Sequence, residues 1–183
     1  MKLLPENVDV KALTQTDEKY ISFDFGCIRF LDSARFMPFA SLDYLANLLS
    51  ECPILNSQPD VSKVLSIETP TFKNRKGIYC YEYIRGTSFQ DIINKMLETK
   101  LPLQKEFYSH LKQSNISDDD YKVANRNYEL LECSNIYDYT MKYLKLDVCL
   151  LADVFENFRT TFINNFQIDP CYSYSAAGLS MLA

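Results

Sequence analysis

The most constraining feature of the sequence is one long stretch of helical periodicity, from Asn135 to about Phe166. At about 100° per residue, Asp147 falls inside an apolar arc of this helix and is the only charged residue there. Burying a carboxylate is costly unless a cation or a hydrogen-bond donor compensates. The periodicity therefore predicts a core-packed helix with one unusual carboxylate. The stripe that defines the arc consists of Leu144, Val148, Leu151, Phe155, Phe158 and Phe162, and it is widened by Leu150 and Val154.

Composition narrows the class of protein. The chain has 183 residues, 47% of them hydrophobic, which suits one domain or one lobe of a larger protein. Its net charge of −5 argues against a protein that coats nucleic acid by charge alone. No glycine-rich phosphate-binding motif occurs. Residues 1–10 lack the apolar segment of a signal peptide, and no stretch approaches the length of a membrane span, so we expect a soluble intracellular protein with no membrane contact.

The cysteines and the single histidine exclude two kinds of chemistry. The six cysteines are scattered without a C-x-x-C pair, and His110 is the only histidine, so a zinc site is not expected. His110 lies on a predicted helix far from any nucleophile motif, which argues against Ser-His or Cys-His hydrolysis. The mostly apolar surroundings of the cysteines predict free thiols in a reducing compartment.

The order of elements predicts an α/β fold. We expect an irregular lead-in over residues 1–18, then a hairpin, a helix and extended segments over 19–87, a helical region over 88–166 and a tail over 167–183. The hairpin should turn near Gly26. Residues 55–75 are predicted to be loop-like and residues 76–84 extended. The predicted helices cover residues 41–51, 88–99, 103–113, 117–133 and 135–166.

Tyr143 lies one helical turn before Asp147, at the i, i+4 spacing that brings two side chains together. A carboxylate can bind a hard divalent cation, and a neighbouring phenol can orient a water molecule for attack. The alternative is an Asp at the edge of a packing face whose carboxylate reaches water or a lysine. The spacing alone leaves both interpretations open.

Tyr143 and Asp147 form a Y-x-x-x-D pattern that resembles the third exonuclease motif of family B DNA polymerases. Other stretches resemble that family in the same order, and the similarity is greatest to the organellar and viral protein-primed group, including the polymerases of self-synthesising transposons. Residues 28–49 are similar to the segment after the second exonuclease motif, "KGIYCYEYI" to the K-x-x-hydrophobic segment, residues 120–159 to the run into the third motif, and "IDPCYSYSAAGLS" to the stretch that leads towards the palm.

The resemblance implies a role for four residues. Asp147 would be a metal ligand of a 3′–5′ exonuclease site, and Tyr143 would position the attacking water. Lys76 would lie near the scissile phosphate, and Ser33 would contact the single-stranded 3′ end of DNA. The family favours Leu after that serine, whereas this chain has Ala34. We expect Tyr143 and Asp147 to share a helix face that looks towards the hairpin and Ser33.

The resemblance also implies a fold and partners. The fold would be an incomplete ribonuclease-H-like exonuclease domain over residues 1–183, with a small sheet that has an open edge. The intact parent would use Mg²⁺ or Mn²⁺, DNA and dNTPs, and a terminal-protein primer. It would polymerise DNA and proofread it.

Several motifs of that family are absent from this chain. There is no credible Asp-x-Glu pair, no Asp-Thr-Asp and no D-x-x-S-L-Y-P, and Phe23-Asp24 lacks the preceding Asn because Tyr20 stands there. Two-metal hydrolysis needs several carboxylates to hold two ions about 3.5–4 Å apart. We therefore expect the chain alone to be inactive and to bind metal weakly or not at all. The alternative is a non-catalytic nucleic-acid-binding or interaction module, and a stand-alone nuclease is disfavoured.

A basic, aromatic stretch precedes and overlaps the "KGIYCYEYI" segment. Charge and stacking could bind single-stranded DNA there, or the stretch could be a solvated loop beside a half-buried strand. Composition favours neither. Its members are Phe72, Lys73, Arg75, Lys76, Tyr79, Tyr81 and Tyr83.

Overall fold

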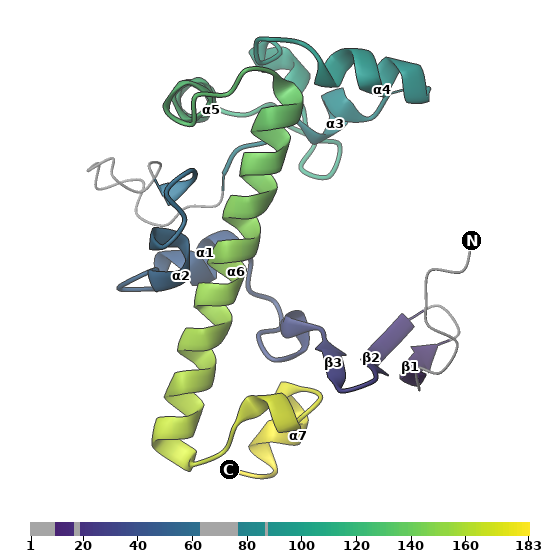
Figure 1. Cartoon of the computed structure of the whole chain (residues 1–183), viewed down its shortest axis with the longest axis vertical. Coiled ribbons are helices and arrows are strands. Elements are labelled where there is room, and N and C mark those ends of the chain that lie inside the picture. The colour runs from purple at the N-terminus through teal and green to yellow at the C-terminus, as the bar shows by residue number, and fades with distance from the viewer. Residues whose placement is uncertain (1–9, 17–18, 63–76, 87) are drawn as a thin grey trace. The chain divides into compact units, whose positions relative to one another are not determined.

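The computed structural model describes residues 10–16, 19–62, 77–86 and 88–183 (Figure 1). It is a mixed α/β protein with a small antiparallel sheet and several helices. By contacts the chain divides into two compact units, residues 1–41 with 155–183, and residues 42–154. Among the described residues, no helix is both long and apolar enough to cross a membrane.

The sheet of the first unit has the strand order β1-β2-β3 and is antiparallel throughout. The strands span Val10–Thr16, Lys19–Phe25 and Ile28–Leu31. The predicted hairpin is confirmed as β2 and β3, and Gly26 takes the positive φ of 60° that their tight turn requires. Phe23 faces Phe30 across the pair, with ring centroids 4.4 Å apart.

The prediction of an irregular segment over residues 1–18 is wrong for its second half. Val10–Thr16 forms β1, whose register against β2 shifts twice, between Leu13 and Thr14 and between Thr14 and Thr16. Pairing with β2 supplies the backbone hydrogen bonds that the polar sequence of β1 does not predict by itself.

The rest of the first unit packs around the last turns of α6 (Ile136–Phe166) and the C-terminal segment. Phe36, after the short helix η1 (Ser33–Arg35), is 4% exposed and lies 6.0 and 6.1 Å from the rings of Phe155 and Phe158. Arg159 on α6 donates to Asp169, which begins the turn η4 (Pro170–Tyr172). The tail then forms the short helix α7 (Ala176–Ser180), so it is more ordered than predicted.

The second unit is helical. Its elements are α1 (Leu42–Asn47), α2 (Pro53–Asn56), α3 (Tyr81–Ile84), α4 (Phe89–Met96), η3 (Gln104–Phe107), α5 (Asp118–Leu130) and the first part of α6. The helices predicted over 88–99, 117–133 and 135–166 are confirmed as α4, α5 and α6. Ser88 and Ser117 cap α4 and α5, because their hydroxyl oxygens accept from the backbone N–H groups of Asp91 and Asp120.

Three predictions for this unit are wrong in part. The helix predicted over 41–51 ends at Asn47, and Pro53 opens α2 instead of merely closing the helix before it. The extended segment over 76–84 becomes the helix α3 from Tyr81 onward. The helical turn allows Cys80 and Ile84 to pack into an apolar cluster with Phe107. These tertiary contacts outweigh the β-propensity of the local sequence.

The helix predicted over 103–113 is reduced to the single turn η3. A bridge between Ser109 and Ser114 folds the following residues back, so His110 does not lie on a helix. The side-chain amide of Gln104 donates hydrogen bonds to the carbonyl of Ile116 and the carboxylate of Asp118, and these bonds hold η3 against the start of α5.

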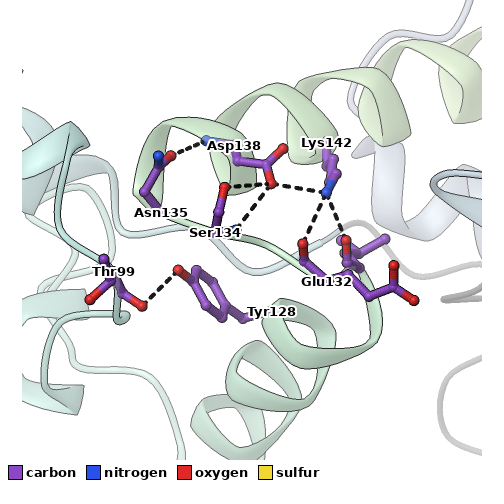
Figure 2. Close-up of polar contacts among 8 residues, drawn as sticks. Thr99, Tyr128, Glu132, Ser134, Asn135, Asp138 and Lys142 are labelled. Carbon is purple, nitrogen blue, oxygen red and sulfur yellow. Dashed lines mark hydrogen bonds and ion pairs between the residues drawn. The ribbon is translucent and has the colours of Figure 1, made fainter.

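The N-terminus of α6 is tied to the C-terminus of α5 by a compact polar network (Figure 2). The Asn135 side chain accepts from the backbone N–H of Asp138, whose carboxylate accepts in turn from the backbone N–H of Ser134. This is a reciprocal cap of the helix start. Lys142 donates to Asp138 and, over 2.7 Å, to the carbonyl of Leu131 at the end of α5. Two helix ends are thereby satisfied by one cluster.

The apolar stripe predicted along α6 is not its buried face over the first half of the helix. Leu144 and Val148 are 52% and 58% exposed. The buried residues lie instead on the side of the helix where Leu150 and Val154 widen the predicted arc. They are Ile136, Tyr139, Tyr143, Leu146, Cys149, Leu150, Asp153 and Val154.

Candidate functional site

The most deeply buried carboxylate of α6 is that of Asp153, whereas the predicted Asp147 is only half-buried. Asp153 is 3% exposed, and its two carboxylate oxygens accept from the backbone N–H groups of Ile54, at 2.8 Å, and Leu55, at 2.9 Å. These are the second and third residues of α2, whose first residue, Pro53, has no N–H to satisfy. Asp153 therefore caps α2 from another helix, and its role is structural. The sequence signal that could have found it is its spacing of three residues from Leu150 and seven from Leu146, both of which are buried.

Asp147 is half-buried, and its Oδ1 atom is inaccessible to solvent. The two lysines nearest in sequence bond elsewhere, since Lys142 contacts Asp138 and Lys145 contacts Asp60. The alternative in which Asp147 is neutralised by one of these two lysines therefore loses support. The neighbour that the i, i+4 spacing predicted, Tyr143, does interact with it by charge and hydrogen bonding.

Tyr143 is 7% exposed and sits at the centre of a tyrosine cluster, Tyr79, Tyr81, Tyr139 and Tyr143. The ring of Tyr79 stacks on that of Tyr143, with centroids 4.7 Å apart and planes 19° apart. The hydroxyls of Tyr81 and Tyr143 are hydrogen-bonded to each other. Tyr139 donates to the carbonyl of Ile78 over 2.6 Å, which holds the segment before α3 against α6. The cluster thus joins residues about sixty positions apart in the sequence.

Gly77 brings the backbone unusually close to this cluster. A Cβ atom placed on Gly77 would lie 2.8 Å from Cδ2 of Tyr143 and 3.3 Å from a methyl group of Leu146. Only a glycine allows this approach, because real Cβ atoms do not reach such distances. The backbone at Gly77 is therefore held directly against the Tyr143 ring.

The electrostatics of the cluster keep the Tyr143 hydroxyl protonated. Burial, the hydrogen bond with Tyr81 and the negative charge of Asp147, in that order, raise the pKa of Tyr143 well above its ordinary value of 10.0. Burial also raises the pKa of Tyr79, against the opposing effect of its hydrogen bond with Thr140. At neutral pH, Tyr143 is thus a neutral donor beside a carboxylate.

The other predicted site residues lie elsewhere. Ser33 begins η1 in the first unit, and its carbonyl accepts from Phe36 over 3.0 Å. Asp147 belongs to the second unit, and the expected approach of these two residues stays a prediction. Lys76 lies outside the described residues, as do Phe72, Lys73 and Arg75. Gly77, the residue after Lys76, contacts Tyr143.

The described residues do not by themselves suit a divalent-metal centre. No group of three or more His, Cys, Asp or Glu side chains is placed to hold an ion in the parts of the chain that the structure describes. Asp147 contributes one carboxylate, whereas a hard cation in a protein takes several oxygen ligands. Its neighbour Tyr143 has a raised pKa, and a protonated phenol is a weak ligand for such a cation.

Sequence reasoning missed the partners of Tyr143 in the segment after Lys76. The alternation of tyrosines at 79, 81 and 83 is the available signal, and the sequence analysis interprets it as an extended segment or a solvated loop.

Comparison with known proteins adds no relative, since no protein-family model, curated protein or solved structure matches the chain.

Proposed function

We propose that this chain is the back part of the 3′–5′ exonuclease domain of a family B DNA polymerase, with an incomplete ribonuclease-H-like fold. The observation that carries the proposal is the meeting of two segments that resemble separate exonuclease motifs. Gly77 and Tyr81, from the K-x-x-hydrophobic segment, contact Tyr143 of the Y-x-x-x-D pattern. If the two segments resembled the polymerase motifs only by chance, they would not be expected to contact each other.

The exposed surface of α6 also supports a partial domain. Apolar residues on the side away from the buried face repeat every three or four residues and are 40% to 58% exposed. A face of this kind is typical of a helix that packs against another layer of structure. Its members are Tyr137, Met141, Leu144, Val148 and Leu151.

In the intact parent, Asp147 would supply one metal ligand and the protonated Tyr143 would orient a water molecule. Lys76 and Ser33 would contact the phosphate and the 3′ end of single-stranded DNA. The parent would use Mg²⁺ or Mn²⁺, polymerise dNTPs and start from a terminal-protein primer. The described residues form no group of carboxylates that would complete the site, so no catalytic step is assigned to this chain alone.

The first experiment is a gel assay of the purified chain with 5′-labelled single-stranded DNA and Mg²⁺ or Mn²⁺. We expect no metal-dependent shortening, because one carboxylate does not hold two ions. The prediction would be contradicted if the chain shortened the DNA, if Asp147→Ala abolished this activity and if the exposed-site control Asp119→Ala retained it. Asp24 and Asp32 would then be the first candidates for the missing ligands.

The second experiment examines the parent. We expect DNA that adjoins the coding segment to encode Asp-x-Glu upstream and Asp-Thr-Asp downstream. A protein extended to include both should shorten single-stranded DNA, and Asp147→Ala should lower that rate by about 100-fold or more. An extended reading frame without these motifs would instead favour the alternative, a non-catalytic nucleic-acid-binding or interaction module built on the same scaffold.

A further inference from the structure

The exposed positions of α6 in the second unit are all apolar. Between Ile136 and Val154, each exposed position of the helix carries a large side chain of this kind, 40% to 58% exposed. A helix whose outer side faces water presents charged and polar residues there. A contiguous apolar surface instead marks a contact with another layer or another molecule. The five residues are Tyr137, Met141, Leu144, Val148 and Leu151.

Other exposed helix surfaces nearby are polar, so this composition is specific to one part of α6. The middle of α5 exposes Lys122, Arg126 and Glu129. The exposed residues of α6 between positions 156 and 165 are Glu156, Asn157, Thr160, Thr161, Asn164 and Asn165. One helix therefore changes from an apolar to a polar outer side where it passes from the second unit to the first.

The spacing of the five exposed residues indicates what covers them. They are separated by four, three, four and three positions, which is the a/d spacing of a coiled-coil seam. A seam of this kind fits a second helix with the same spacing, whose side chains insert between its own. The spacing continues to Phe155 and Phe158, where the ring of Phe36 covers it within the first unit. Over Tyr137–Leu151 the seam is open.

We propose that this seam is the interface of a homodimer, in which α6 of one copy packs in parallel against α6 of a second copy. The second copy presents the matching surface, because it carries the same seam. In heptad notation Val148 occupies an a position, and Leu144 and Leu151 occupy d positions. A β-branched residue at a with leucine at d is the combination that favours parallel pairs of helices.

The charges beside the seam agree with a parallel pair. Lys145 and Asp147 flank it on opposite sides, at the e and g positions. In an antiparallel pair centred on this stretch, each of these charges would face its own copy. In a parallel pair, Lys145 faces Thr140 of the other copy and Asp147 faces Ala152, so no like charges meet.

The size of the seam predicts a reversible dimer. Covering five half-exposed side chains in each of two copies buries on the order of 1,000 Å², which is near the lower end for specific interfaces. We therefore expect a dissociation constant of about 1–100 µM. A further layer of the same domain is the competing occupant, and it would leave the chain monomeric in solution.

The test is sedimentation equilibrium of the full chain between about 1 and 500 µM, in a reducing buffer that prevents disulfide formation. We expect wild-type protein to change from monomer to dimer over this range. Leu144→Glu should weaken the dimer by about 100-fold or more, because it buries two carboxylates beside each other in the seam. Val148→Ile should retain the dimer, since it keeps a β-branched side chain at the a position.

The matched control is Leu111→Glu, which places the same charge at a leucine that is 93% exposed and lies outside α6. It should dimerise as wild type does. At about 1 µM, where wild-type protein is mostly monomeric, Leu144→Glu and wild type should have the same circular dichroism spectrum. This comparison separates lost association from lost structure.

Cross-linking tests the parallel arrangement. Leu144→Cys is made together with Cys27→Ser, which removes the exposed cysteine of the chain. In a parallel pair the two copies of position 144 lie side by side, so mild oxidation should give a disulfide-linked dimer on a non-reducing gel. Leu111→Cys in the same Cys27→Ser chain should give little of this product.

The proposal is overturned if wild-type protein stays monomeric at the highest concentration, or if Leu144→Glu dimerises as tightly as wild type. In the first case a further layer of the domain becomes the occupant of the seam. A dimer that does not cross-link through position 144 would overturn the parallel arrangement. The measurements contain no DNA and no metal, and the contact of Gly77 with Tyr143 lies outside the seam, so their outcome is independent of the proposed exonuclease function.

Discussion

Replacing Asp153 should destabilise the second unit more than any surface substitution on α6. Both carboxylate oxygens accept a backbone hydrogen bond from the N-terminus of α2, and the residue is 3% exposed. Hydrogen bonds to a charged group contribute about 1.5–3 kcal/mol each, and truncation leaves two buried N–H donors without an acceptor. We therefore expect Asp153→Ala to lower the free energy of unfolding by about 3–5 kcal/mol.

Asp153→Asn provides a graded test, because the amide keeps the shape of the side chain but offers one acceptor oxygen instead of two. We expect a loss of about 1.5–3 kcal/mol, between wild type and Asp153→Ala. The matched control is Asp119→Ala, which removes a carboxylate that is 87% exposed and forms an ion pair with Lys122, on the next turn of the same helix. Its effect should stay within about 0.5 kcal/mol.

The assay is urea unfolding followed by far-ultraviolet circular dichroism, with a thermal melt as a second measurement. For a chain of this length, a loss of 3 kcal/mol corresponds to about 6 °C or more in the melting temperature. An Asp153→Ala variant within about 0.5 kcal/mol of wild type would refute the reasoning. So would Asp153→Asn if it matched wild type, since the second oxygen would then contribute nothing.

Two other predictions concern close contacts elsewhere in the chain. Gly77→Ala should lower the free energy of unfolding, measured in urea, by about 1–3 kcal/mol, because its Cβ would lie 2.8 Å from the Tyr143 ring. An unchanged free energy of unfolding would mean that the ring moves aside at no cost. Arg159 holds the pKa of Asp169 down to about 2, so the stability from this pair should be full above about pH 4, the unfolded pKa, and be lost as the pH falls towards 2. Arg159→Met should flatten this part of the pH dependence of the melting temperature, and an unchanged slope would contradict it.

The elements that the sequence predicted well are those specified by local signals. Ser88 and Ser117 mark the starts of α4 and α5, and Gly26 marks the hairpin turn. The long stretch of helical periodicity was enough to predict a helix over residues 135–166, and the structure has α6 at Ile136–Phe166. Caps, tight turns and long periodicity act within a few residues, so they can be recognised without knowledge of the fold.

The candidate site was predictable only in its local half. The i, i+4 spacing of Tyr143 and Asp147 brings the two together on any helix, and they do interact. The partners Gly77 and Tyr81 lie more than sixty residues away, and only packing brings them to the Tyr143 ring. Periodicity says which residues share a face, but it does not say what covers that face.

The same limit decided which carboxylate of α6 is buried. Apolar residues occur on more than one face of α6, and the sequence alone favoured the arc that contains Asp147. The tertiary structure buries Asp153 more completely than the half-buried Asp147, because the N-terminus of α2 supplies two backbone donors there. The sequence determined that α6 forms and that Tyr143 and Asp147 are neighbours. Which side faces the core was decided by the element packed against it, since a buried charge is tolerated only where another element supplies its hydrogen bonds.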